Sequence, residues 1–117
     1  MSLSDTLSVW MNTSMREPTF LILVALADAE RHGYGIIREV EKLSEGRLKL
    51  GPGSLYGALD RLSGQNLIRA TRTEAVNGRL RRYYAINDAG LIAVREETTR
   101  RSAVLQAAQS RLGLAST

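Results

Sequence analysis

The sequence predicts a mainly α-helical chain with one small β-hairpin. Three observations support this fold class in a chain of 117 residues, which is long enough for one domain with a modest core. Apolar residues recur at intervals of three and four over much of the first half, as on one face of a helix. An Asn77-Gly78 pair separates two strand-like segments, which is a strong sign of a hairpin. A long helical segment, from residue 89 to about residue 112, follows the second strand.

The first two predicted helices differ in composition. Residues 4–13 are expected to form a short helix with Leu7, Trp10 and Met11 on one side. Residues 18–29 form the second predicted helix, in which Pro18 suits the first turn because proline lacks an N–H group that would be unpaired there. This second helix is apolar on most sides, so we expect it to be buried at the centre of the domain.

Two further helices are predicted to be amphipathic, at residues 34–44 and 51–65. Their apolar stripes consist of Ile36, Ile37, Val40 and Leu43 in the first and of Leu55, Ala58, Leu59 and Leu62 in the second. Between these helices, residues 47–50 alternate between charged and apolar side chains and predict a short strand.

The predicted hairpin consists of strands at residues 67–73 and 80–86. Because side chains alternate between the two faces of a strand, the second strand presents Leu80, Arg82, Tyr84 and Ile86 on one face and Arg79, Arg81, Tyr83 and Ala85 on the other. We expect Tyr84 and Ile86 to pack inward and Arg82 to lie against the domain. Arg79 and Arg81, near the turn, should be free to reach a partner.

Three helices with a short strand and a hairpin make a winged helix-turn-helix, which we assign to residues 16–87. Residues 1–15 are expected to be a helical extension, and residues 88–117 a helix for dimerisation. This last helix carries apolar residues near heptad spacing, interrupted by a polar stretch at residues 95–102. The predicted dimer contacts are Leu91, Val94, Leu105, Ala108 and Leu112.

Positive charge is concentrated in helix 51–65 and the hairpin. Between Arg61 and Arg82 the chain has six arginines and one acidic residue, Glu74, which gives this stretch a net charge of +5. The whole chain carries +4, so the remainder is slightly acidic. Fourteen of the sixteen basic residues are arginine, whose planar group forms paired hydrogen bonds with phosphate or guanine. A folded unit with this charge distribution is expected to bind a polyanion.

The sequence gives no support for an enzyme, a metal site or a cofactor. The chain has no cysteine and a single histidine, His32, so no second Cys or His ligand is present. His32 is therefore interpreted as a turn or helix-capping residue. The Gly51-Pro52-Gly53 segment lacks the Gly-Lys-Ser/Thr ending of a phosphate-binding loop, and no acidic pair or nucleophile is suitably spaced for catalysis.

The sequence also predicts a cytoplasmic location. No apolar stretch approaches the roughly 20 residues that a membrane span needs. The start of the chain lacks the charged and apolar regions of a signal peptide, and the absence of cysteine agrees with a reducing compartment.

Four segments form a specific combination in their order along the chain. They are His32-Gly33-Tyr34, residues 50–62 (LGPGSLYGALDRL), Asn66-Leu67-Ile68 and residues 78–90 (GRLRRYYAINDAG). Together they resemble the PadR family of transcriptional regulators over about residues 19–94. The single helix after the hairpin is similar to that of the short PadR subgroup. Ser54 and Asn87 stand where threonine is usual in the family, and Asp60 is acidic where many members are basic.

The resemblance implies double-stranded DNA as the partner, and the residues agree with it. In helix 51–65 the glycines leave room for a groove wall, Ser54 and Tyr56 can donate hydrogen bonds to phosphates, and Arg61 can pair with phosphate or guanine. The predicted DNA contacts are Ser54, Tyr56, Gly57 and Arg61 in this helix and Asn77, Gly78, Arg79 and Arg81 in the hairpin. The alternative is that the glycines only permit close helix packing and the arginines are a solvated strand edge.

The resemblance further implies a homodimeric repressor of a pseudo-palindromic operator, released by a small aromatic effector. Trp10, Met11 and Met15 are candidate walls of an effector pocket, although the N-terminal helix could instead only cover the dimer seam. Two other functions stay open. One is a winged-helix module that binds another protein, and the other is a small-molecule-binding dimer without specific DNA binding.

Overall fold

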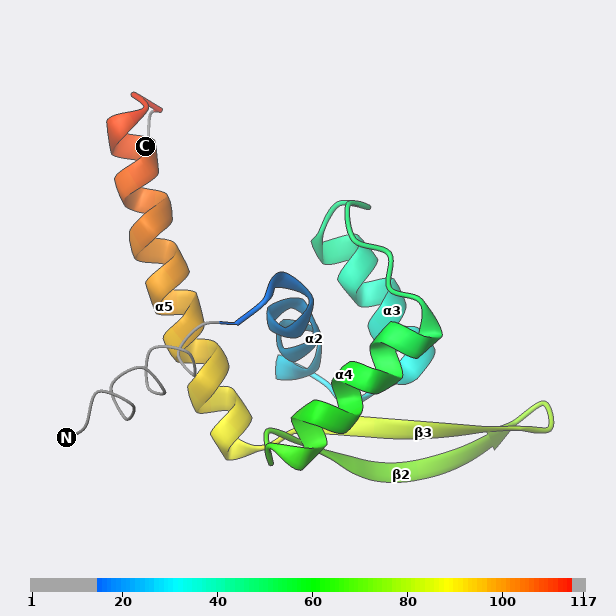
Figure 1. Ribbon diagram of the computed structural model, residues 1–117. Coiled ribbons are helices and arrows are strands. Elements are labelled where there is room, and N and C mark those ends of the chain that lie inside the picture. Colours follow the sequence, from blue (N-terminus) through cyan, green and yellow to red (C-terminus); the bar gives the residue numbers. More distant parts are fainter. Residues whose placement is uncertain (1–14, 115–117) are drawn as a thin grey trace.

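The computed structural model describes residues 15–114, which form four helices and a three-stranded antiparallel sheet (Figure 1). In order, the elements are α2 (Glu17–Ala27), β1 (Arg31–His32), α3 (Gly33–Leu43), α4 (Pro52–Gly64), β2 (Ile68–Val76), β3 (Arg79–Ile86) and α5 (Asp88–Arg111). The β2–β3 hairpin extends past α4 as a wing, and α5 rises as a separate arm on the opposite side. The predicted winged helix-turn-helix is therefore confirmed. The predicted helix at residues 4–13 lies outside the described residues.

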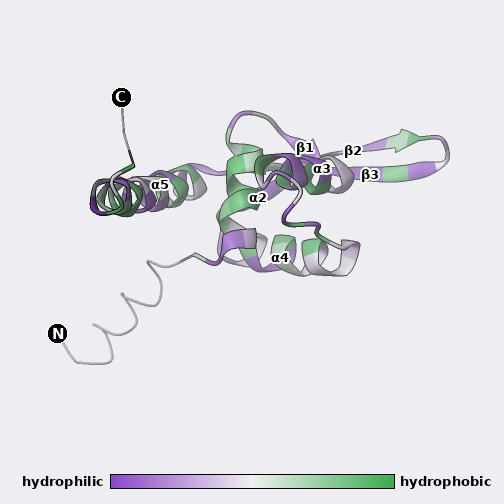
Figure 2. Cartoon of the chain, turned by 90° about the horizontal axis from the view of Figure 1, so that it is seen from above, coloured by the Kyte–Doolittle hydropathy of each residue, from purple (hydrophilic) through white to green (hydrophobic). Residues whose placement is uncertain are grey.

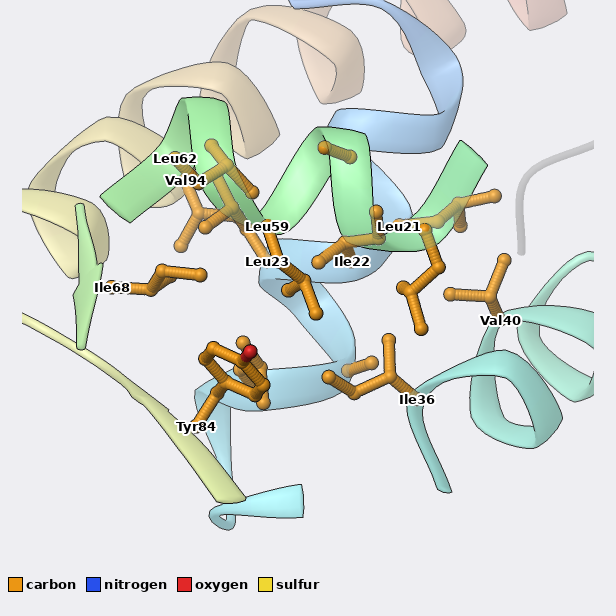
Figure 3. Close-up of a cluster of buried hydrophobic side chains, with 14 residues drawn as sticks. Leu21, Ile22, Leu23, Ile36, Val40, Leu59, Leu62, Ile68, Tyr84 and Val94 are labelled. Atoms are coloured by element: carbon orange, nitrogen blue, oxygen red, sulfur yellow. The ribbon is translucent and has the colours of Figure 1, made fainter. Parts of the chain in front are cut away.

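Helix α2 is the centre of the core because it is apolar around most of its circumference. Its buried residues are Leu21, Ile22, Leu23, Ala25 and Leu26, and around them pack Ile36 and Val40 of α3 and Leu55, Ala58, Leu59 and Leu62 of α4 (Figure 3). Figure 2 shows the same concentration of apolar residues on α2. The helix ends at Ala27, two residues before its predicted end.

His32 and Gly33 join the start of α3 to the sheet and to α4. The Gly35 N–H donates a hydrogen bond to His32 Nδ1 at 3.2 Å, so His32 caps the helix as predicted. Gly33 is buried, and a Cβ atom at this position would lie 2.6 Å from the Tyr56 hydroxyl oxygen. A side chain at this position would have to displace the exposed Tyr56 ring.

The third strand of the sheet is β1, and the predicted strand at residues 47–50 is wrong. Strand β1 pairs with β3, with Arg31 opposite Tyr84, which gives the strand order β1-β3-β2. Residues 47–50 form no strand, and the Leu48 N–H donates instead to Ser44 Oγ at 3.0 Å. The alternation that suggested a strand arises because Leu48 and Leu50 pack partly buried against the core.

The wing is a regular hairpin with one irregularity near its base. Asn77 and Gly78 have φ values of 52° and 76°, which is the left-handed pair that a tight turn between twisted strands requires. Strand β2 runs to Val76, three residues beyond its predicted end. The register shifts between Ala70 and Arg72, so an extra residue in β2 forms a bulge.

Only the first half of α5 belongs to the core of the domain. Gly90 lies so close to the Leu67 carbonyl that no side chain would fit, which lets α5 start against the residue that precedes β2. Val94 is 5% exposed and packs in the core of its own chain, so it is not available to a dimer seam. Leu105 and Leu112, further along, are 58% and 71% exposed.

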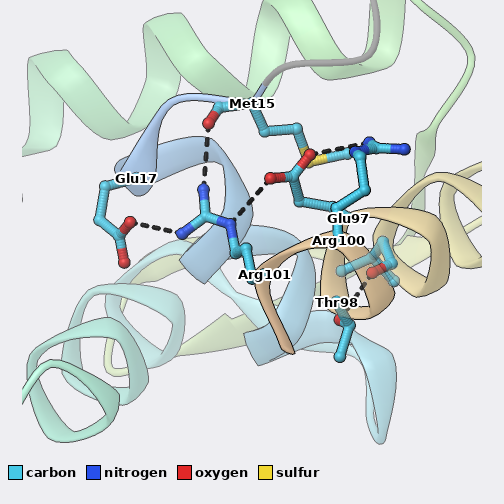
Figure 4. Close-up of polar contacts among 7 residues, drawn as sticks. Met15, Glu17, Glu97, Thr98, Arg100 and Arg101 are labelled. Carbon is cyan, nitrogen blue, oxygen red and sulfur yellow. Dashed lines mark hydrogen bonds and ion pairs between the residues drawn. The ribbon is translucent and has the colours of Figure 1, made fainter. Parts of the chain in front are cut away.

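Arg101 fastens α5 to the start of α2 (Figure 4). Its Nε donates to Glu97 Oε2 at 2.9 Å, its Nη1 to Glu17 Oε2 at 2.6 Å, and its Nη2 to the Met15 carbonyl oxygen at 3.0 Å. Burial alone would raise the pKa of Glu97, but hydrogen bonds from Arg100 and Arg101 outweigh it and hold that pKa below its usual range. The polar stretch that interrupts the predicted dimer stripe therefore orients α5.

Candidate nucleic-acid interface

Helix α4 has one face in the core and one face open to solvent. The buried face consists of Leu55, Ala58, Leu59 and Leu62. Ser54, Tyr56 and Arg61 are exposed on the rest of the helix, and Gly57 is half-buried between them. None of the four predicted contacts of this helix belongs to its buried face.

The glycines of α4 are not required for packing within the chain. A Cβ atom at Gly53 or Gly64 would meet no atom within 4 Å. At Gly57 it would meet only the Arg61 side chain, at 3.7 Å, which is an ordinary contact. Close helix packing thus does not explain these three residues. They leave a low surface that a groove wall can approach.

The arginines near the wing tip lie on both faces of the hairpin. Cross-strand partners share a face, and Arg81 is opposite Glu74 whereas Arg82 is opposite Thr73. Arg82 is on the same face as the buried Tyr84. It is nevertheless exposed, so the prediction that Arg82 lies against the domain is wrong. The hairpin has already passed the edge of the core at this position.

Five of the six arginines in this region are available to a polyanion. Arg61, Arg69, Arg79, Arg81 and Arg82 are exposed and form no ion pair with a carboxylate of residues 15–114. Arg72 is engaged, because its Nε lies 2.7 Å from Glu30 Oε1 and its Nη1 lies 3.0 Å from Glu74 Oε2. The hydrogen bond with Glu30 is the main reason why the pKa of Arg72 is raised.

A hollow of about 350 Å³ separates the wing from the helices. It is lined by His32, Gly33 and Tyr34 at the start of α3, Tyr56 of α4, and Arg79, Leu80, Arg81 and Arg82 of β3. Tyr34 and Tyr56 are 63% and 48% exposed, so their hydroxyl groups can donate to a phosphate. The chemistry of this lining, cations beside hydroxyl donors, suits a phosphate backbone.

The structure distributes the predicted contacts over three places. Tyr56, Arg79 and Arg81 come together at the hollow, Ser54, Gly57 and Arg61 lie along α4, and Asn77 and Gly78 form the wing tip. Tyr34 and Arg82 were not among the contacts predicted from the sequence, and both line the hollow. The signal for Tyr34 was its place in the His32-Gly33-Tyr34 segment, which carried the family resemblance without an assigned role.

The candidate effector residues are only partly described. Trp10 and Met11 lie outside residues 15–114. Met15 packs partly buried against the core, and its carbonyl oxygen accepts the hydrogen bond from Arg101. Met15 therefore has a role within its own chain.

Residues 15–114 contain no group of three or more His, Asp or Glu side chains that could hold a metal ion. Within the same residues, no helix has the length and apolar character that crossing a membrane requires.

The family model of the PadR-like transcriptional regulators matches residues 22–96, from the second half of α2 to the first turns of α5. The chain belongs to the PadR-like family. Members of this family are regulators of transcription and not enzymes, which agrees with the prediction from the residues.

Two curated proteins are similar to this PadR-like chain. The transcriptional regulator Rv3488 of Mycobacterium tuberculosis is 37% identical over 76 residues, which cover 65% of this chain and 67% of that protein. A 37.1 kDa protein in transposon TN4556 of Streptomyces fradiae is 55% identical over 49 residues, or 42% of this chain. The chain spans only 14% of the length of the transposon protein.

Solved structures of PadR proteins share the fold. A PadR-like transcriptional regulator from Bacillus cereus superimposes with a TM-score of 0.67 at 27% identity, over 80% of this chain and 89% of that one. PadR of Bacillus subtilis, solved in complex with operator DNA, gives a TM-score of 0.63 at 20% identity, over 71% of this chain and 47% of that one.

Proposed function

We propose that this PadR-like regulator is a sequence-specific DNA-binding repressor that acts as a homodimer in the cytoplasm. The observation that carries the proposal is the open face of α4, where Ser54 and Arg61 are exposed and a Cβ atom at Gly53 or Gly64 would meet no atom within 4 Å. A helix with low relief and flanking donors fits a major groove, whose edges carry the base pattern. The operator complex of Bacillus subtilis PadR supports DNA as the partner.

The wing would supply affinity without base preference. Arg79, Arg81 and Arg82 are exposed around the hollow, and Tyr34 and Tyr56 face them from the helices. Contacts of these groups with phosphates would orient α4 in the groove and release bound counterions. The fifth unpaired group, Arg69, lies nearer the base of the wing and would add to the positive field.

The second half of α5 supports the proposed homodimer. Leu105 and Leu112 are more than half exposed, and the helix is about 36 Å long, so two such helices could bury a long apolar seam. Two copies related by a two-fold axis would place their α4 helices in successive major grooves, about 34–36 Å apart. The operator would then be a pseudo-palindrome. A small aromatic effector bound near Trp10, Met11 and Met15 would release the repressor from its operator by shifting the two DNA-binding domains relative to each other.

In vitro selection from random duplexes tests this function. We expect enrichment of a motif with two related half-sites about one helical turn apart, and the variant Arg61→Ala should enrich it less strongly. Enrichment of no motif, together with a binding partner that is a protein, would favour the alternative winged-helix interaction module. Quenching of Trp10 fluorescence by an aromatic compound without any motif would favour the small-molecule-binding dimer.

A further inference from the structure

The direction of the wing is decided at the bulge in β2. Ala70 pairs with Tyr84 and Arg72 with Tyr83, so Thr71 is the extra residue. A bulge bends its strand and increases the local twist, and the rest of the hairpin follows that new direction. Any group that holds Thr71 and Arg72 therefore also holds the wing tip.

Glu30 binds both of these residues from outside the wing. It lies in the connection between α2 and β1, and both of its carboxylate oxygens are used. Thr71 Oγ1 donates to Glu30 Oε2 at 2.8 Å, and Arg72 Nε donates to Glu30 Oε1 at 2.7 Å. One side chain of the helical part is thus connected to both residues at the bend.

The network continues across the wing to the cap of α3. Arg72 Cζ lies 3.7 Å above the Tyr83 ring, and the Tyr83 hydroxyl donates to Glu74 at 2.9 Å. The Tyr83 ring meets the His32 ring edge-on, with centroids 5.3 Å apart. Glu30 and His32 therefore contact the base of the wing from two neighbouring positions of the helical part.

Because the charged side chains of this network are exposed, its main effect is to orient the wing and not to stabilise the fold. The Arg72 and Glu30 side chains are 50% and 37% exposed. Ion pairs this accessible add little to stability, because water and salt screen them. They still select one geometry when several hydrogen bonds converge on one carboxylate.

We propose that Glu30 is a positioning residue that holds the wing at the angle at which α4 and the wing arginines meet the same DNA. This inference rests on the proposed DNA-binding function and assigns Arg72 to the orientation of the wing. For the removal of the Glu30 charge, it predicts a change in operator affinity opposite in sign to the change expected from electrostatics alone. Removing an acidic group near DNA should strengthen binding to any duplex, whereas loss of a positioning group weakens binding to the operator.

The first experiment compares Glu30→Gln with Asp28→Asn, which removes the same charge two residues earlier. Among residues 15–114, the Asp28 carboxylate pairs with Arg31, at 3.4 Å, and not with the wing. With the selected operator we expect Glu30→Gln to bind roughly tenfold more weakly, the size of one misplaced base or phosphate contact. Random duplexes should bind no more weakly, and Asp28→Asn should lose no affinity for either DNA. Tighter operator binding by Glu30→Gln would overturn the inference.

The second experiment reads the wing angle without DNA. The chain has no cysteine, so spin labels can be placed at Ser63→Cys on α4 and Ala75→Cys on β2, both at exposed positions. Dilution with unlabelled protein leaves only distances within one chain. We expect a narrow distance distribution that broadens or shifts in Glu30→Gln but not in Asp28→Asn. An unchanged distribution in Glu30→Gln would overturn the inference even if the protein binds DNA. A changed distribution without a selectable operator would support wing positioning and contradict the proposed function.

Discussion

His32 must be neutral at Nδ1 to cap α3, because that nitrogen accepts the Gly35 N–H. Burial lowers the pKa of His32, and the positive charge of Arg81 lowers it further. The other charged groups that act on the ring are Glu74, which opposes this shift, and Arg38, which adds to it. Protonation would break the cap and place a cation beside the wing.

The stability of the protein should therefore depend on pH through this one ring. The pKa of His32 is lower in the folded than in the unfolded chain, so its contribution is complete above the unfolded value, about 6.5, and is lost as the pH falls below it. We expect a loss of up to about 1 kcal/mol, the usual worth of an N-cap. Urea unfolding between pH 5.5 and 7.5 measures it. In His32→Asn, which keeps a capping side chain without a titrating ring, the slope should disappear.

Arg82 should behave as a phosphate contact in spite of its place on the inward face of β3. We expect Arg82→Ala to weaken binding to operator and random DNA alike, and to reduce the slope of log affinity against log salt by about 0.9. Fluorescence anisotropy at several salt concentrations gives both quantities. Arg95→Ala, at an exposed position of α5, is the control and should leave the slope unchanged. An unaltered slope in Arg82→Ala would show that this side of the wing does not touch DNA.

At the scale of the element, the glycines of α4 lower the stability of the helix but leave its outer surface open to a DNA groove. Glycine inside a helix costs about 0.5–1 kcal/mol relative to alanine. Since a methyl group at Gly57 would meet only an ordinary contact, the cost has no packing reason within the chain. The glycines of α4 therefore agree better with a helix that enters a DNA groove than with a helix of maximal stability.

The variant Gly57→Ala should accordingly show two opposite effects. The free energy of unfolding should rise by up to about 1 kcal/mol, while operator affinity should fall because the methyl group separates the helix from the groove. Thermal unfolding and operator titration measure the two effects. Ser102→Ala, at an exposed position of α5, also improves helix propensity and should leave DNA affinity as it is. Equal or tighter operator binding by Gly57→Ala would contradict the role assigned to the glycines.

The helices and the hairpin turn could be predicted because their signals are local. The stripe of α3 and the Asn77-Gly78 pair depend only on neighbours in the chain. Strand β1 has two residues, too few for any alternation, and exists because β3 offers a free edge to it. The false strand at residues 47–50 failed for the converse reason, since its leucines alternate without a partner strand.

In the candidate interface, too, features with local signals could be predicted and features that depend on distant residues could not. The outer face of α4 follows from helical spacing, so the exposure of Ser54 and Arg61 could be predicted. The state of Arg72 could not, because it depends on Glu30, 42 positions away in the sequence. The exposure of Arg82 depends on where the core ends beneath the hairpin, which strand alternation alone does not contain.

At the scale of the whole molecule, the proposed homodimer rests on the exposed half of α5. We expect Leu105→Lys to yield a folded monomer, because Leu105 is 58% exposed and contributes nothing to the core of its own chain. Sedimentation equilibrium and circular dichroism measure the mass and the fold. Gln106→Lys adds the same charge at the next, exposed position and should remain dimeric. A Leu105→Lys protein with the mass of a dimer would place the interface elsewhere.

In the proposed dimer, Arg101 would influence the spacing between the operator half-sites. The single guanidinium joins the residues before α2, the first turn of α2 and the middle of α5, and so sets the angle between the domain and its arm. In a dimer held by α5, that angle determines how far apart the two recognition helices stand. A substitution at Arg101 would therefore change the number of base pairs between the half-sites. The base sequence recognised within each half-site would stay the same.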